Sequence, residues 1–337
     1  MKTAIAALAF CFAAGSASAA SCVGNNLIDA LPQDLQAEIA SRTEAVPYHE
    51  GLYWQAVKGN ATISLIGTFH FDDAGHAAIV EGLEPAIADA ALLLVEMGPE
   101  EEDRMKARMA SDPSLMVDPD GPTLPERLSD EDWAALSSAL EERGLPAIIA
   151  SRLKPWYAAT MLGLAPCMIR EMSDPDANRG LDWRLMDVAE ARGVPIRALE
   201  PWDTVLRMFA ELTPEEEIEM IRYSLPGAAH ADDYAVTMSD AYAEENVWQI
   251  WEFGRIDAYR NTGLSEAEVD EMTAEAQQML MIDRNQSWIA RLTEAASDAA
   301  GSGKGVVAAF GALHLPGEEG VLRLLEKDGW TIERRAL

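Results

Sequence analysis

Cysteine is scarce in this chain of 337 residues, which contains three. None of them has a second cysteine or a histidine at the spacing of a structural zinc motif, and this argues against a cysteine-rich zinc site. The metalloprotease signature His-Glu-x-x-His is absent as well. Any metal ion must therefore be bound by residues that lie far apart in the sequence.

Basic residues are also few. The chain has 26 Lys and Arg against 57 Asp and Glu, which gives a formal net charge of −31. Such a charge argues against nucleic acids and against anionic membrane surfaces as partners. It is compatible with the well-solvated surface of an exported protein and does not restrict a neutral substrate.

Long apolar runs are missing. The longest near the N-terminus, residues 3–14, is far short of the roughly 20 residues that span a bilayer. It follows the basic Lys2 and precedes the small residues 17–19 (Ala-Ser-Ala), so residues 1–19 are predicted to be a cleavable signal peptide. We therefore expect a periplasmic or secreted protein. Lipoprotein processing before Cys22 is a weaker alternative, because residues 19–21 lack the expected apolar start.

Export determines which cysteines remain and whether they can form a disulfide. Cys11 leaves with the signal peptide, and Cys22 and Cys167 remain as an even pair in an oxidising compartment. The prediction is a disulfide between them, which would stabilise the fold by a few kcal/mol in the chain-entropy treatment. The alternative is two unpaired thiols.

Short apolar runs predict strands near both ends of the mature chain, at 51–58, 61–66, 91–95, 194–199, 306–310 and 330–334. The turn signal Gly59-Asn60 joins the first two as a hairpin. Helical patterns fill the intervals, at 74–88, in most of 100–172 including 130–143, and at 181–192, 213–221, 231–278, 279–300 and 320–327. The prediction is an α/β (α+β) fold with a mixed central sheet and long helical insertions.

An ionisable residue follows four of the predicted strands, namely His70, Glu96, Glu200 and His314. The two histidines have the same context, an apolar run followed by Gly-x-x-His that begins at Gly67 or at Gly311. Ligands of open α/β sheets bind beyond the carboxyl ends of the parallel strands, so these side chains are candidates for one shared site.

Four segments together resemble the TraB/GumN family, which includes Tiki-type proteases and is related in fold to erythromycin-esterase and ChaN-like proteins. They are ISLIGTFH at 63–70, ALLLVEMG at 91–98, the run from 180 to 201, and the run from 306 to 332. The resemblance extends over residues 48–334. It implies an exported or membrane-tethered α/β protein, and some members of the family are metal-dependent peptidases.

The domain organisation that follows is an N-terminal segment, 20–45, and one TraB/GumN-like domain, 46–337. Its sheet core is expected in three stretches, and helical insertions separate them. The core stretches are 48–98, 180–205 and 284–337, and the insertions are 99–179 and 206–283.

The resemblance also assigns roles to residues. His70, His314 and Glu96 are the expected ligands of a divalent metal ion, with zinc, manganese or cobalt as candidates, and coordination positions stay open for water and substrate. A second glutamate, Glu200, is expected to transfer a proton and Arg284 to stabilise an oxyanion or hold a substrate carboxylate. Supporting positions are Asp182, Asn285, Gly67 and Gly311.

Several of these residues have a structural alternative. Glu200 before a proline fits an ordinary turn, and Asp182 fits an acidic residue that favours a helix N-terminus. Arg284 fits an ion pair with Asp283 or with a nearby glutamate, and the glycines fit close approaches of the backbone. Three other histidines, His49, His76 and His230, are expected on the surface, and Trp248 and Trp251 on a core-facing side of a helix.

Three functions compete. The first is a metal-dependent hydrolase, most simply a peptidase acting on a peptide, a protein or a small molecule. The second is a metal-free hydrolase in which a His–Glu pair activates water against an ester. The third is a binding protein that holds a peptide or glycan without turnover. The sequence has no signal for an oligomeric state.

Overall fold

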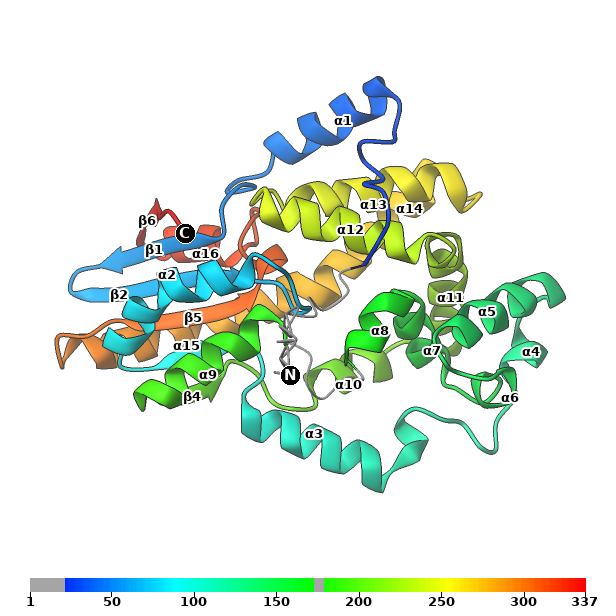
Figure 1. Ribbon diagram of the computed structural model, residues 1–337, viewed down its shortest axis with the longest axis horizontal. Coiled ribbons are helices and arrows are strands. Elements are labelled where there is room, and N and C mark those ends of the chain that lie inside the picture. Colours follow the sequence, from blue (N-terminus) through cyan, green and yellow to red (C-terminus); the bar gives the residue numbers. More distant parts are fainter. Residues whose placement is uncertain (1–21, 173–178) are drawn as a thin grey trace, which may run out of the picture.

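A computed structural model describes residues 22–172 and 179–337, and within these residues six strands form one mixed sheet (Figure 1). The strand order is β4-β3-β5-β2-β1-β6. The predicted α/β (α+β) fold is confirmed, whereas the predicted signal peptide at 1–19 lies outside the described residues. The strands are β1 (Tyr53–Lys58), β2 (Ala61–Thr68), β3 (Leu93–Val95), β4 (Ile196–Ala198), β5 (Val306–Gly311) and β6 (Thr331–Arg334).

The sheet is built on the predicted hairpin. Lys58 pairs with Ala61 across the turn, and Gly59 has a left-handed φ of 61°, as a tight hairpin turn requires. Strand β5 then pairs in parallel with β2 on one side and with β3 on the other, and β4 pairs in parallel with β3. Only β1 runs against its neighbours β2 and β6. The carboxyl ends of β2, β5, β3 and β4 consequently lie at one edge.

Helices cover both faces of the central strands. Phe310 and its same-face neighbours pack against α15 (Asp283–Ala300) and α16 (Val321–Lys327). Val307 and Ala309 face the other way, toward α2 (His76–Asp89) and α9 (Leu181–Arg192). A strand that is buried on both sides needs apolar residues at every position, which explains the run Val-Val-Ala-Ala-Phe in β5.

The remaining helices lie to one side of the sheet (Figure 1). Local signals in the sequence set the ends of these helices and of those that cover the sheet. Ser129 accepts the N–H of Asp132 as the N-cap of α5, and Gly193, with a φ of 67°, ends α9. The remaining helices are α1 (Gln33–Glu44), α3 (Pro99–Ser111), α4 (Leu124–Arg127), α5 (Asp130–Glu142), α6 (Ala147–Ala150), α7 (Pro155–Leu162), α8 (Pro166–Met172), α10 (Thr204–Ala210), α11 (Pro214–Ala228), α12 (Ala231–Ala243), α13 (Trp248–Asn261) and α14 (Glu266–Gln277). The chain also forms 3-10 turns η1 (Pro113–Leu115) and η3 (Ala312–His314) and a π-helical turn η2 (Gln278–Ile282).

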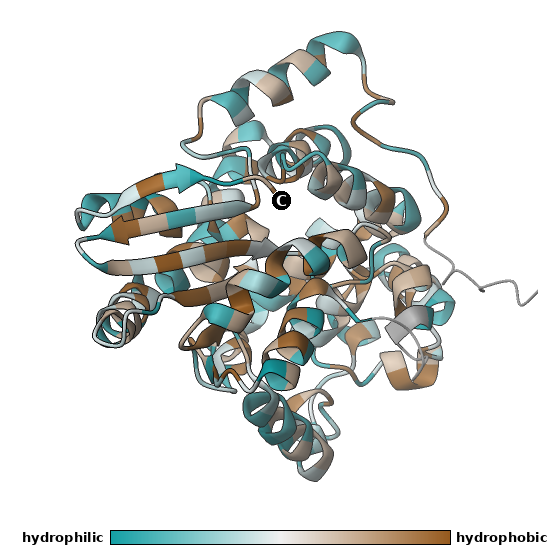
Figure 2. Cartoon of the chain, turned by 60° about the vertical axis from the view of Figure 1, so that its left-hand side comes forward, coloured by the Kyte–Doolittle hydropathy of each residue, from teal (hydrophilic) through white to brown (hydrophobic). Residues whose placement is uncertain are grey.

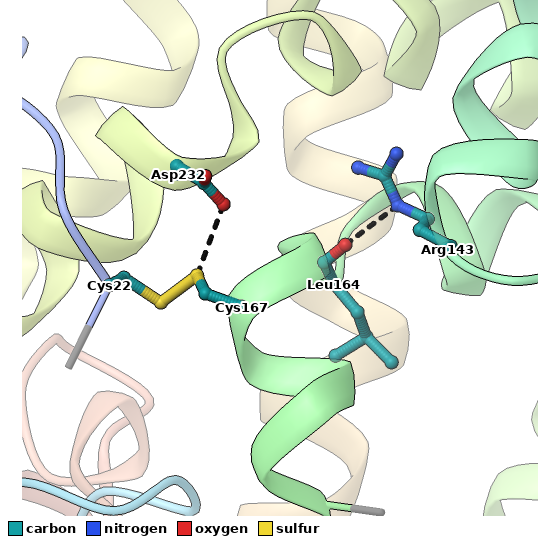
Figure 3. The surroundings of a disulfide bond; sticks show 5 residues. All are labelled: Cys22, Arg143, Leu164, Cys167 and Asp232. Carbon is teal, nitrogen blue, oxygen red and sulfur yellow. Dashed lines mark hydrogen bonds between the residues drawn. A yellow bond between two sulfur atoms is a disulfide. The ribbon is translucent and has the colours of Figure 1, made fainter. Parts of the chain in front are cut away.

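The predicted disulfide between Cys22 and Cys167 is confirmed (Figure 3). It joins residues 145 positions apart, with their Cα atoms 5.4 Å from one another, and attaches the N-terminal segment to α8. Asp232 Oδ1 of α12 lies 3.1 Å from Cys167 Sγ. Because both sulfurs are bonded to each other, this group of three side chains is not a metal site. The segment is also held by hydrogen bonds to α12, such as that of Leu27 N–H to Thr237 Oγ1 at 2.8 Å.

One expectation about exposure was wrong. His76, expected on the surface, is fully buried at the start of α2, where its ring meets Phe69 and Tyr242 edge to face. The apolar partners come from β2's following loop and from α12, so the sequence around His76 alone did not indicate them. Among the described residues, no helix combines the length and the apolar character needed to cross a bilayer.

Candidate active site

Five side chains that the sequence singled out meet at the carboxyl ends of the parallel strands. His70 follows β2, Glu96 follows β3, Glu200 follows β4 and His314 ends the 3-10 turn after β5, while Arg284 enters from the first turn of α15. All five are linked by contacts of 4.0 Å or less. Segments from both ends of the chain thus contribute to one group of side chains.

His314 is held in one tautomer. Its Nδ1 lies 2.6 Å from Asn285 Oδ1, and the amide nitrogen of Asn285 donates to the carbonyl oxygen of Glu319 at 2.9 Å. The amide oxygen therefore faces the ring, so Nδ1 carries the proton and Nε2 presents a lone pair. This Nε2 accepts a hydrogen bond from Arg284 Nη1 at 3.2 Å. Burial, with 6% of the residue exposed, lowers the pKa of His314 to about 4 and keeps the ring neutral.

His70 is oriented in the same way by a carboxylate. Its Nδ1 lies 2.9 Å from Asp182 Oδ2, and Asp182 Oδ1 accepts the hydroxyl of Thr68 at 2.5 Å. The Nε2 atom then faces Glu96 Oε1 at 4.0 Å. Asp182, followed by Glu96, raises the pKa of His70 to about 9, although 56% of the side chain is exposed. Asp182 is both the acidic residue at the start of α9 and the partner of a site histidine.

Glu96 stands between the two imidazoles. Its Oε1 accepts the N–H of Gly311 at 2.6 Å and lies 3.8 Å from His314 Nε2, and its Oε2 accepts from Arg284 Nη2 at 2.5 Å. Burial is the largest influence on the pKa of Glu96 and raises it. The imidazoles, the guanidinium and the Gly311 N–H together outweigh burial and hold this pKa at about 2. Glu96 is consequently an ionised carboxylate at neutral pH.

Glu200 holds Arg284 in a two-point ion pair. Arg284 Nε donates to Glu200 Oε2 at 3.0 Å and Nη2 donates to Glu200 Oε1 at 2.8 Å, while Trp288 Nε1 donates to Oε2 at 3.3 Å. Burial raises the pKa of Glu200, and Arg284 opposes that shift. Since both oxygens are engaged, Glu200 in this arrangement positions the guanidinium. The sequence reasoning had not included Trp288, although it lies one turn after Arg284.

The two motif glycines permit close approaches. A Cβ atom on Gly67 would lie 2.8 Å from Leu315 Cδ1 and 3.0 Å from the backbone of Ala312. A Cβ atom on Gly311 would lie 3.0 Å from His70 Nε2 and 3.2 Å from Glu96 Oε1. A side chain at Gly311 would therefore fill the space onto which the donor atoms converge. Gly180, which the sequence analysis did not single out, is more restricted still, because its Cβ would overlap the carbonyl oxygen of His70.

These donors fit a divalent metal ion in kind. Two imidazole Nε2 atoms and one carboxylate, each with its second polar atom hydrogen-bonded elsewhere, are a common ligand set of hydrolytic sites. Two ligands of one tetrahedral zinc lie about 3.4 Å apart. The separations from Glu96 Oε1, 4.0 Å to His70 and 3.8 Å to His314, are wider, and the two histidine Nε2 atoms lie more than 4.8 Å from one another, so the side chains would have to close around an ion. Binding would also require Arg284 to give up its hydrogen bond to His314, and His70, an imidazolium at neutral pH with its pKa of about 9, to release its Nε2 proton.

A cavity of about 230 Å³ opens beside this group, and His70, Glu96 and Arg284 form part of its wall. His314 is not part of this wall and is joined to it through the hydrogen bond from Arg284. The arrangement therefore places ionised side chains in the wall of a pocket at the strand ends, which is the usual position of a ligand or substrate site in an α/β protein.

No curated protein sequence matches the chain. The profile of the TraB/PrgY/gumN family matches residues 52–334, a range that includes both Gly-x-x-His motifs and every candidate side chain of the strand-end group. The match covers most of the chain, and the resemblance seen in the four sequence segments is confirmed. The protein belongs to the TraB/PrgY/gumN family.

Proposed function

We propose that the protein is a metal-dependent hydrolase that cleaves peptide bonds. The observation that supports this proposal is the shared orientation of His70 and His314. Each donates its Nδ1 proton to a fixed acceptor and directs Nε2 toward Glu96 Oε1. A peptide is the favoured substrate because the family resemblance includes Tiki-type proteases.

His70, His314 and Glu96 would hold the ion, with zinc, manganese or cobalt as candidates. Such an ion lowers the pKa of a bound water from about 15.7 to near 7 and polarises a carbonyl group. The protein supplies orientation through Asp182 and Asn285, which keep the two Nδ1 atoms protonated. In metal sites of this kind, removing a residue that hydrogen-bonds a histidine ligand lowers metal affinity or activity by roughly 10- to 100-fold.

Arg284 has a second role in this proposal. Its guanidinium lines the cavity, where it would stabilise an oxyanion; because it already pairs with Glu96 and Glu200, it is not proposed to hold a substrate carboxylate. Glu200, first expected to transfer a proton, is now proposed as the residue that positions Arg284. Its two oxygens are already hydrogen-bonded, which leaves it poorly placed to accept another proton.

Elemental analysis tests the metal. Wild-type protein, purified without chelators or nickel resin and then supplied with zinc, manganese or cobalt, is expected to retain about one ion per chain. The variants His70→Ala and His314→Ala are expected to retain none and to lose hydrolysis of a mixed peptide library. His230→Ala is the matched control, because His230 is exposed at the start of α12. Equal metal content in all four proteins would contradict the proposal.

A metal-free hydrolase is the second candidate. The hydrogen bonds of Arg284 to His314, Glu96 and Glu200 already satisfy the buried polar atoms of the site. A neutral His314 would also serve as general base once Arg284 Nη1 withdraws its hydrogen bond from the Nε2 lone pair. Hydrolysis that survives exhaustive chelation and is lost in His314→Ala would favour this candidate. Stoichiometric peptide binding without any turnover would instead support a binding protein.

A further inference from the structure

We propose that the cavity beside the strand-end group is a specificity pocket for a large apolar side chain of the substrate. This inference rests on the proposed hydrolase function and names the chemistry of the residue next to the cleaved bond. It follows from the composition of the cavity wall, from its volume, from its connection to the site and from its charge.

The wall is rich in sulfur and indole groups that come from three separate segments. Two methionines precede or belong to α3, a tryptophan and a methionine come from α9, and another tryptophan precedes α10. These residues are Met97, Met105, Trp183, Met186 and Trp202. The volume of about 230 Å³ exceeds the roughly 150 Å³ that accommodates a benzene ring in an engineered protein cavity. A Leu, Met or Phe side chain therefore fits.

The cavity is continuous with the proposed reaction site. His70, Glu96 and Arg284 line the same space as the apolar side chains. A substrate side chain seated among the methionines and tryptophans consequently places its own backbone beside His70 and Glu96. Binding energy from that side chain would then orient the adjacent peptide bond.

Charge in the cavity disfavours an acidic substrate residue. Four carboxylates line it, from Glu96, Glu102, Asp182 and Glu200. The guanidinium of Arg284 is already paired with Glu96 and Glu200. A substrate carboxylate buried there would be repelled by like charges and would lose its hydration. An apolar side chain has no charge to be repelled and no bound water of this kind to lose.

One wall has features that let it adapt to different side chains. Helix α3, which supplies Met105 and Glu102, buries none of its residues and is largely hydrophilic in Figure 2. Methionine is also flexible and polarizable, which suits a pocket that takes several shapes. We therefore expect selection for large apolar side chains as a class.

The test uses acetylated peptides Ala-Ala-X-Ala-Ala with an amidated end, where X is Leu, Met, Phe, Ala or Glu. Binding is measured by calorimetry with His314→Ala, an inactive variant in the proposal whose substitution lies outside the cavity wall, and turnover is measured with the wild type. Peptides with Leu, Met or Phe are expected to bind and react about 10- to 100-fold better than the Ala peptide. The Glu peptide is expected to be the weakest.

Variants of the wall complete the experiment. Trp202→Ala and Met105→Ala are expected to reduce the preference for Leu over Ala to within about 3-fold. Both side chains are partly exposed and belong to no core cluster of the described residues, so the fold is expected to survive. Met109→Ala, one turn further along α3 and outside the cavity wall, is the control and keeps the preference.

The outcomes separate the two proposals. Graded binding with no turnover would support the pocket and contradict the hydrolase. Turnover with equal rates for Leu and Ala, or a preference for Glu, would overturn the pocket and leave the hydrolase in place. Failure of every peptide to bind would overturn the pocket.

Discussion

At the scale of single residues, Asp182 and Asn285 decide how the two histidines face the site. We expect Asp182→Ala to lower metal affinity or turnover by about 10- to 100-fold, because His70 would lose the acceptor that fixes its ring and its tautomer. Metal titration and kinetics measure the effect. Asp187→Ala on the same helix is the control, since Asp187 is exposed and pairs only with Arg179 among the described contacts. A similar loss in both variants would indicate damage to α9 and contradict the assignment.

The buried His76 makes a prediction about pH. Burial lowers its pKa and Arg184 adds to the shift, whereas Asp73, Asp72 and Asp182 oppose it. Neither ring nitrogen has a hydrogen-bond partner among the described atoms. The unfolded chain binds a proton at His76 below about pH 6.5 and the folded chain does not, so the free energy of unfolding falls as the pH drops below that value.

His76→Phe removes this proton and keeps a ring against Tyr242. We expect its free energy of unfolding to change less than that of the wild type between pH 7.5 and 5.5. The difference cannot exceed about 1.4 kcal/mol per pH unit for one proton. Urea unfolding at both pH values measures it. Parallel pH profiles for the two proteins would show that His76 is protonated in the folded state.

At the scale of secondary-structure elements, a single arginine joins α5 to the connection between α7 and α8. Arg143 is buried and donates to the carbonyl oxygen of Leu164 at 2.7 Å (Figure 3). It also donates to the carbonyl oxygens of Ala139 and Leu162 at 2.8 and 3.0 Å. Arg143→Met would leave three acceptors without this donor. We expect a loss of about 3 kcal/mol or more in the free energy of unfolding.

Thermal and urea unfolding check this expectation. Arg222→Met on α11 is the control, since Arg222 is exposed and makes surface ion pairs with Glu219 and Asp132. Such pairs contribute about 0–1 kcal/mol. Equal destabilisation by the two substitutions would contradict the special role of Arg143.

The elements also show what the sequence could predict. The apolar runs located all six strands and the residues that follow them, because buried strands and their ends have strong local patterns. The lengths of the strands were predicted less accurately than their positions. Of the run 91–95 only 93–95 forms the strand, although the backbone of residues 91 and 92 is still hydrogen-bonded to Gly305 and Val307. The register of β2 with β5, which opposes Thr68 to Gly311, depends on contact between distant segments and has no local signal.

The site was predictable to a similar degree. Residue types and motif spacing identified His70, Glu96 and His314 as members of one group. The hydrogen bonds that orient them did not follow from the sequence, because Asp182 and Asn285 reach the histidines only through the packing of α9 and α15 on the sheet. For the same reason the sequence did not indicate that Arg284 binds both glutamates.

At the scale of the whole molecule, the disulfide closes a loop of 145 residues. The chain-entropy treatment gives roughly 5 kcal/mol for a loop of this length, as an upper value. We expect Cys22→Ser to lose a substantial part of that amount in urea unfolding and to keep the strand-end site, which lies on other elements. Wild-type protein treated with a reductant is expected to match the variant. No change in either sample would show that the hydrogen bonds to α12 suffice to hold the segment.

The position of β5 in the sheet determines how late the sheet can be completed while the chain is being synthesised. This strand lies between β2 and β3 in the sheet, yet more than two hundred residues separate the end of β3 from the start of β5 in the chain. At roughly 5–20 residues per second, the synthesis of these residues takes tens of seconds, during which β2 beside β1 and β3 beside β4 each keep one apolar strand edge without its partner. Chains truncated before residue 306 will therefore remain open to proteases, and a chaperone that shields β2 and β3 would act during this interval.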